Sequence, residues 1–132
     1  MFISVGAVIR FQNKYLLQLR DNKPDIYFPN HWGLFGGATE NNESPTESIK
    51  REIFEEISLE INDITSFLTL TIDTSFFDNI RKRIFFRCDI NNPDKIILRE
   101  GKKYDFFEFD KIRHLNIVPF DFAAISFLNK NI

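Results

Sequence analysis

The segment Gly37–Leu59, GATENNESPTESIKREIFEEISL, contains a cluster of carboxylates at helical spacing. Glu52, Glu55 and Glu56 project within about one third of the circumference of an α-helix, because a helix turns about 100° per residue. Like charges at these spacings repel one another. The cluster therefore indicates a bound cation, and hard oxygen ligands of this kind suit Mg²⁺ or Mn²⁺. The alternative is a solvated helix face, since glutamate is a good helix former.

The same segment carries the signals of a helix that begins at Pro45. Ser44 suits the N-cap, proline is favoured at the first helical position, and Glu47 completes a capping box with Ser44. An aliphatic stripe repeats at i, i+4 and i+8 and is expected to be buried: Ile49, Ile53 and Ile57. The glutamates lie beside this stripe, so we expect them at the rim of the core, where a cleft can form.

The spacing from Gly37 to Leu59 resembles the Nudix box, GX5EX7REUXEEXGU, in which U is a bulky aliphatic residue. Six fixed letters and both aliphatic positions match, and Ser58 stands where the pattern has glycine. At roughly 5–7% per residue type, six letters match by chance on the order of once in ten million windows. The flanks extend the resemblance to a small Nudix hydrolase of the MutT type. It implies an α+β fold, with a mixed β-sheet packed between α-helices, and a single domain over residues 1–132.

Hydrophobic patterning predicts the order β-β-β-α-β-β-β-α, which describes a mixed sheet between helices. We expect extended segments at residues 2–11, 15–19, 32–35, 64–73, 81–90, 96–98 and 105–109. Gly6 is a candidate kink or bulge in the first strand, and residues 76–79 are expected to form a turn. A closing helix at 119–130 is expected to point inward Ala123, Ile125 and Leu128.

Composition restricts the possible functions. With 132 residues, 43% hydrophobic and 27% charged, the chain is expected to be globular, and its net charge of −2 gives no electrostatic footprint for duplex nucleic acid. No apolar stretch approaches the ~18–20 residues of a membrane span, and the N-terminus does not resemble a signal peptide. Cys88 is the only cysteine, so we expect a buried structural thiol and a reducing, cytoplasmic location.

The resemblance implies a metal site of oxygen ligands. In the Nudix family, residues at the positions of Glu52 and Glu56 coordinate a divalent metal together with the backbone carbonyl at Gly37. Glu55 is expected to be a ligand or to hold metal-bound water. Glu100, in the segment Arg99-Glu100-Gly101, resembles the additional metal-binding glutamate of MutT-type proteins, whereas its simpler interpretation is an exposed turn residue.

Two further residues of the box are expected to support this cluster. Arg51 is predicted to orient the carboxylates through bidentate hydrogen bonds. Glu43 is predicted mainly to tie the loop to the helix start. A glutamate is expected to take the proton of the attacking water, and the sequence leaves Glu52, Glu55 and Glu100 open for that role.

Candidate substrate contacts lie outside the helix. By resemblance, Arg20 is a candidate for binding substrate phosphate. Phe35 and Asp121 are candidates for contact with the substrate, although MutT-type proteins have Asn near the position of Asp121, which places a purine preference in doubt. Trp32 is interpreted as a core residue or as a stacking surface for a base. Three arginines are expected on one face of the same strand, where they either steer phosphates into the cleft or form a solvated face: Arg81, Arg83 and Arg87.

These features together predict a metal-dependent hydrolase. The expected reaction cleaves a phosphoanhydride in a nucleoside diphosphate linked to another group, such as a nucleoside triphosphate or nucleotide sugar, with Mg²⁺ or Mn²⁺ as cofactor. Two alternatives on the same fold are a nucleotide sensor without hydrolysis and an isomerase of the isopentenyl-diphosphate type. The sensor usually loses box glutamates, and the isomerase requires a catalytic cysteine. A homodimer is possible from family resemblance.

Overall fold

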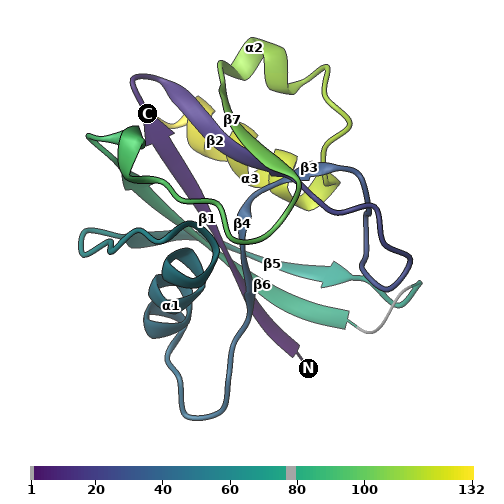
Figure 1. Cartoon of the computed structure of the whole chain (residues 1–132). Coiled ribbons are helices and arrows are strands. Elements are labelled where there is room, and N and C mark those ends of the chain that lie inside the picture. The colour runs from purple at the N-terminus through teal and green to yellow at the C-terminus, as the bar shows by residue number, and fades with distance from the viewer. Residues whose placement is uncertain (1, 77–79) are drawn as a thin grey trace.

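The computed structural model describes residues 2–76 and 80–132 (Figure 1). The described elements are β1 (Phe2–Phe11), β2 (Lys14–Leu19), β3 (Trp32–Gly33), β4 (Phe35–Ala38), α1 (Pro45–Ile57), β5 (Thr65–Asp73), β6 (Ile80–Asp89), the 3₁₀ turn η1 (Pro93–Lys95), β7 (Lys103–Phe107), α2 (Phe109–Ile112) and α3 (Pro119–Lys130). Within these ranges no helix has the length and apolar character needed to cross a membrane.

The strands form one mixed sheet organised around β1. Its main path has the order β3-β2-β1-β6-β5, while β4 pairs with β1 and β7 pairs with β2. β1 runs parallel to β6, with Phe2 opposite Arg81 and Arg10 opposite Asp89. Its pairings with β2 and β4 are antiparallel. The mixed sheet predicted from the sequence is therefore confirmed.

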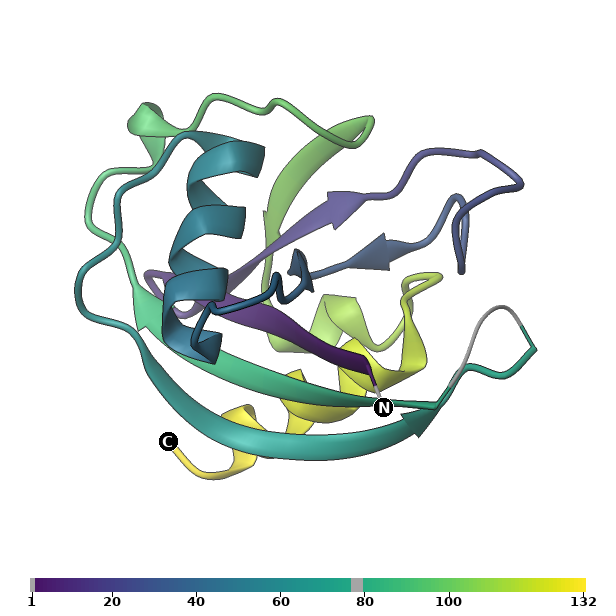
Figure 2. The same ribbon diagram turned by 90° about the horizontal axis from the view of Figure 1, so that it is seen from below.

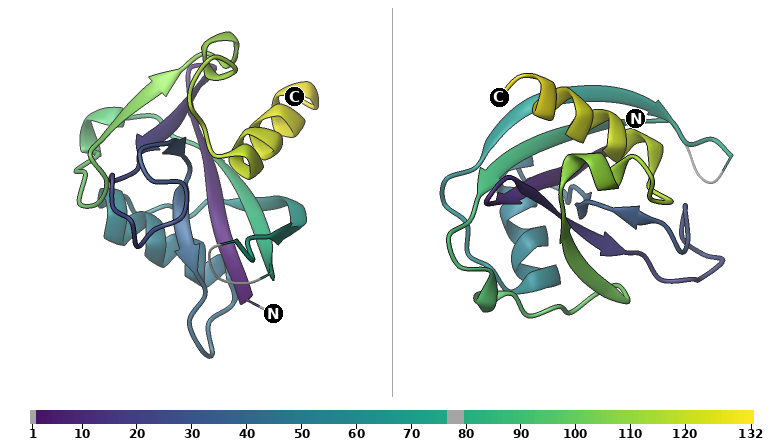
Figure 3. Two further views of the ribbon diagram at one scale, coloured as in Figure 1. Left: turned by 90° about the vertical axis from the view of Figure 1, so that its right-hand side faces the viewer. Right: turned by 90° about the horizontal axis from the view of Figure 1, so that it is seen from above.

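Helices cover both faces of the sheet (Figures 2 and 3). α1 packs on one face, over a buried cluster that includes Ile49, Ile53, Ile57, Phe35 and Phe86. α3 and α2 pack on the opposite face, over a second cluster that includes Phe85, Ile112, Ala124, Ile125 and Leu128. Neighbouring residues Phe85 and Phe86 of β6 thus point into different clusters, as the alternation of a strand requires. This arrangement is the expected α/β/α sandwich.

The predicted start of α1 is confirmed. Ser44 Oγ accepts a hydrogen bond from the Glu47 backbone N–H at 3.1 Å, and Glu47 Oε1 accepts one from the Ser44 N–H at 2.9 Å. The isoleucine stripe is fully buried. The helix ends where Ser58 adopts a left-handed backbone, with φ 62°, and donates its N–H to the Phe54 carbonyl.

Several expected elements were wrong in detail. Residues 96–98 form no strand; the Ile97 N–H instead donates to the Ile57 carbonyl at the end of α1, at 3.0 Å. The last strand begins at Lys103 and ends at Phe107, because α2 starts at Phe109. In α3 the buried alanine is Ala124 and not Ala123. Most of the turn expected at 76–79 lies outside the described residues.

Gly6 is neither a kink nor a bulge, because β1 pairs with β6 without interruption. A Cβ atom at Gly6 would lie 2.6 Å from Nη2 of Arg83, so glycine makes room for that guanidinium. Arg83 is 4% exposed, which corrects the interpretation of a solvated arginine face. Its Nη1 donates to the Val5 carbonyl at 3.0 Å and to Ser4 Oγ at 3.3 Å, and its Nε donates to Asp121 Oδ1 at 3.3 Å.

This buried pair generates a stability prediction. Asp121→Asn leaves Arg83 buried without a counter-ion, which typically costs about 3–5 kcal/mol. Urea unfolding at pH 7 should therefore show a loss of about that size. Asp63→Asn removes an exposed carboxylate and should change stability by less than about 0.5 kcal/mol. Equal stability of the two variants would show that the Arg83–Asp121 pair does not hold α3 against β6.

Candidate functional site

A cleft of about 590 Å³ opens beside the C-terminal part of α1. Its wall includes Gly36 and Gly37 of β4, Glu56 of α1 and the loop that carries Glu100. Cationic side chains share the wall: Arg20, Lys23, Arg81, Arg83 and Arg99. A cleft with both carboxylates and cationic side chains favours an anionic ligand. Arginine or lysine would bind part of its negative charge, and a metal cation held by the carboxylates would bind the rest.

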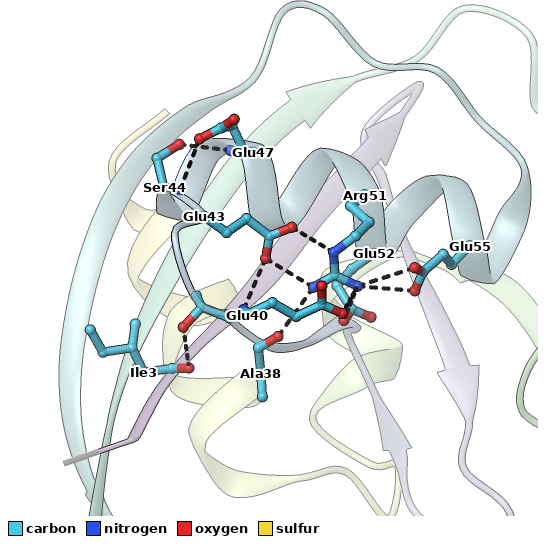
Figure 4. Close-up of polar contacts among 10 residues, drawn as sticks. Ile3, Ala38, Glu40, Glu43, Ser44, Glu47, Arg51, Glu52 and Glu55 are labelled. Atoms are coloured by element: carbon cyan, nitrogen blue, oxygen red, sulfur yellow. Dashed lines mark hydrogen bonds and ion pairs between the residues drawn. The ribbon is translucent and has the colours of Figure 1, made fainter.

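The guanidinium of Arg51 lies at the centre of the carboxylates next to this cleft (Figure 4). It binds Glu43 in a bidentate manner, with Nε to Oε2 at 2.6 Å and Nη2 to Oε1 at 3.0 Å. Its Nη1 donates to Glu52 at 3.0 Å and to Glu55 at 3.1 Å. The predicted orienting contacts of Arg51 are thus present, and one cation offsets the repulsion among three acids.

Glu43 ties the preceding loop to α1, as expected. Besides its two bonds to Arg51, its Oε1 accepts the backbone N–H of Glu40 at 3.0 Å. These hydrogen bonds, first those from Arg51 and then that from Glu40, lower the pKa of Glu43 to about 2. The side chain is therefore charged across the physiological range and holds Arg51 in place.

Glu52 lies directly against the backbone of Gly37. A Cβ atom at Gly37 would be 2.6 Å from Glu52 Oε1, so only glycine lets the strand pass this close to the carboxylate. The Glu52 side chain is 14% exposed, whereas that of Glu55 is 50% exposed. The structure thus brings Gly37 and Glu52 together and leaves Glu55 at the outer edge of the cluster.

Glu56 is the buried member of the cluster, with 2% of its surface exposed. Its carboxyl accepts the Gly36 N–H at 3.2 Å. Burial raises its pKa to about 9, and the hydrogen bond and charge of Glu52, followed by the charge of Glu100, add to the effect. Without a cation Glu56 therefore holds a proton at neutral pH.

Glu100 is an exposed residue of the loop between η1 and β7, and it lines the cleft. Partial burial raises its pKa, and the charges of Glu52, Glu55 and Asp21 raise it further. The next residue, Gly101, has φ 85°, and a Cβ there would lie 2.6 Å from Gln18 Oε1. The loop thus turns on a glycine and brings Glu100 within the electrostatic influence of α1.

The donors fit a hard divalent cation, although they are not assembled around one. Among residues 2–76 and 80–132, no group of three or more His, Cys, Asp or Glu side chains is arranged to hold a metal ion. Arg51 draws Glu52 and Glu55 toward itself, and Glu56 carries a proton. All available donors are oxygens, and a cation would replace the proton on Glu56.

The three candidate substrate contacts have different positions. Arg20 lines the cleft, donates its Nε to the Tyr27 carbonyl at 3.2 Å and stacks on the Tyr27 ring at 4.9 Å. Phe35 is fully buried beneath α1, so in this structure it cannot contact a substrate. Asp121 is also buried and accepts the Leu34 N–H at 3.0 Å. Both residues are therefore buried, and neither is part of the cleft lining.

Trp32 and Cys88 both have the structural role that the sequence suggested. Trp32 packs edge-to-face on Phe107, with ring centroids 4.9 Å apart, and belongs to the α3 side of the core. Burial raises the pKa of Cys88 to about 12, in agreement with a structural thiol. Sequence reasoning missed Tyr27 and Arg99 as cleft residues. The only available signal was the position of Arg99 beside Glu100.

Comparisons with known proteins agree with the fold. A family model described as the NUDIX domain matches residues 2–126. An 8-oxo-dGTP diphosphatase of Buchnera aphidicola subsp. Schizaphis graminum (strain Sg) is 27% identical over 114 residues, which are 86% of this chain and 82% of the relative. The MutT protein from Methanosarcina mazei Go1 superimposes with a TM-score of 0.79 at 24% identity, covering 98% of this chain and 94% of that chain. The NUDIX domain of Shewanella oneidensis NrtR, solved with ADP ribose, gives 0.83 at 16% identity, with 99% and 88% covered.

The protonated Glu56 generates a prediction for the metal-free protein. Between its ordinary pKa of 4.5 and the folded value of about 9, the folded state holds a proton that the unfolded chain has lost. Stability should therefore fall as pH rises through this window. Glu56→Gln removes the titration, so its melting temperature with EDTA should exceed wild type at pH 8 by about 4 °C or more. The difference should vanish near pH 5; a constant difference at all pH values would contradict the assignment.

Proposed function

The chain belongs to the Nudix family, because the NUDIX domain model matches residues 2–126, and we propose that it hydrolyses a nucleoside triphosphate to a nucleoside monophosphate and pyrophosphate. The observation that carries this proposal is the position of Glu56 and Glu100 on the wall of a cleft that also carries arginines. A MutT-like pyrophosphohydrolase is the enzyme class that this family and the 8-oxo-dGTP diphosphatase relative support. Other nucleoside diphosphates linked to a group X are the wider substrate class.

The proposed metal is Mg²⁺, with Mn²⁺ as the alternative. Its ligands would come from the carbonyl of Gly37 and from Glu52, Glu55, Glu56 and Glu100. When bound, the cation would neutralise the diphosphate and acidify the attacking water. Glu56 would be neutral without a metal and would lose its proton when a cation binds. Metal binding would therefore convert this carboxyl into a charged ligand.

The chain's own groups would handle the proton and the substrate. Glu52, Glu55 and Glu100 are the candidate general bases. Glu52 and Glu55 are both occupied by hydrogen bonds from Arg51, whereas the raised pKa of Glu100 favours proton uptake by its carboxylate. Arg20, which also lines the cleft, would bind a phosphate of the substrate. Phe35 and Asp121 would act indirectly, by packing and by holding the cleft floor.

A panel of substrates tests the reaction. Nucleoside triphosphates (8-oxo-dGTP and dGTP among them), nucleotide sugars, dinucleoside polyphosphates and ADP-ribose should be incubated with Mg²⁺ or Mn²⁺. We expect pyrophosphate release from at least one triphosphate, and its complete loss with excess EDTA. If ligands bind but none is cleaved with either metal, the sensor role replaces the hydrolase. Isomerase activity is disfavoured because Cys88 is buried with a raised pKa.

Glu56→Gln tests the metal site. The substitution keeps the shape and the hydrogen bond from Gly36 but removes the charge that a cation requires, so Mg²⁺-dependent turnover should fall at least about 100-fold. Glu60→Gln, an exposed change outside the cleft, should retain wild-type turnover. Circular dichroism should show both variants folded. Wild-type turnover in Glu56→Gln would remove Glu56 from the proposed ligand set.

A further inference from the structure

Ser58 is the one position at which this chain departs from the glycine of the box, and it occupies a backbone conformation that favours glycine. It caps α1 with φ 62° and ψ 23°, in the left-handed region. Glycine adopts this conformation without strain, whereas a side chain with a Cβ does not. A serine here is therefore unfavourable for the backbone, and its hydroxyl is the feature that glycine lacks.

That hydroxyl contacts the loop between η1 and β7, which contributes Arg99, Glu100 and Gly101 to the lining of the cleft. Ser58 Oγ accepts a hydrogen bond from Nε of Arg99 at 2.6 Å. The same loop is attached to the end of α1 by two backbone bonds, from the Ile97 N–H to the Ile57 carbonyl at 3.0 Å and from the Arg99 N–H to the Glu56 carbonyl at 2.8 Å. Both the main chain and the side chain of Arg99 are thus fixed relative to α1.

Arg99 differs from the other arginines near the carboxylates. Arg51 is bound by glutamates of the box, and Arg83 is bound by Asp121. In the part of the chain that the structure describes, no carboxylate forms an ion pair with Arg99, which lies exposed on the wall beside Glu56. Because Ser58 accepts from Nε, both terminal nitrogens of the guanidinium remain available as a fork. Such a fork matches two oxygens of a phosphate.

We propose that Arg99 binds a phosphate group of the substrate and that Ser58 is a positioning residue, whose hydroxyl orients the guanidinium of Arg99. This inference rests on the proposed function in that the ligand carries a polyphosphate. The fork lines the same cleft as Glu56 and Glu100, so it supplies positive charge next to these two carboxyl groups. Ser58 thereby compensates for its unfavourable backbone with a contact that no glycine can make.

The first test measures binding without turnover. An α,β-methylene analogue of dGTP, titrated calorimetrically with Mg²⁺, should bind Arg99→Ala at least about tenfold more weakly than wild type. Arg99→Lys should be intermediate, because it keeps the charge but loses the fork. Arg113→Ala removes an exposed arginine outside the cleft lining and should bind like wild type. Unchanged affinity of Arg99→Ala, or an equal loss in Arg113→Ala, would overturn the proposal.

The second test separates positioning from helix capping. Ser58→Gly relieves the left-handed backbone and should raise the melting temperature, whereas Ser58→Ala keeps the strain and should not. Both remove the hydroxyl, so both should raise KM several-fold with little change in kcat. A KM that follows the melting temperature, or that stays at the wild-type value in both variants, would show that Ser58 only ends the helix.

Failure of the two proposals can be distinguished. If wild type cleaves no triphosphate yet binds the analogue, the hydrolase assignment fails while the comparison of Arg99→Ala with Arg113→Ala still decides the role of Arg99. If wild type cleaves a triphosphate and Arg99→Ala retains its KM and its affinity for the analogue, the hydrolase assignment stands and the Arg99 proposal fails.

Discussion

The arrangement of the acidic cluster depends on the guanidinium of Arg51. Carboxylates at helical spacing repel one another, and the helix that carries them also has to bury an isoleucine stripe. Arg51 resolves this conflict by binding Glu43 from the loop together with Glu52 and Glu55 from its own helix. The loop, the helix and the acids are therefore fixed by one cation, and the inner carboxyl, Glu56, avoids the remaining repulsion by keeping its proton.

A second guanidinium, that of Arg83, organises another part of the cleft wall. Arg83 reaches across the sheet from β6, fills the space that Gly6 leaves and binds Asp121 at the start of α3. Asp121 also accepts the Leu34 N–H, just before the glycines of β4. The two faces of the sandwich thus meet at the cleft through buried polar groups, which need full hydrogen bonding to be tolerated there.

Local signals made part of this structure predictable from the sequence. The start of α1, its buried stripe and the contacts of Arg51 depend on residues within one short segment, so spacing and capping rules were sufficient. The errors arose where distant segments decide the outcome. Gly6 leaves space for the guanidinium of Arg83, which lies 77 positions later in the chain. The segment 96–98 bonds to the end of α1, through the Ile97 N–H, instead of to a strand. Phe35 precedes the cleft glycines but points into the core, because a strand alternates its side chains.

The parallel pairing of β1 with β6 has a consequence for biosynthesis. The first strand of the chain finds its longest partner only at residues 81–89, so most of the polypeptide must leave the ribosome before the centre of the sheet can close. Until then the edge of β1 that faces β6 stays unpaired, and the antiparallel pairings of β1 with β2 and β4 are the ones that can form early. Closing such a long loop slows folding, and an unpaired strand edge favours aggregation until the sheet is complete.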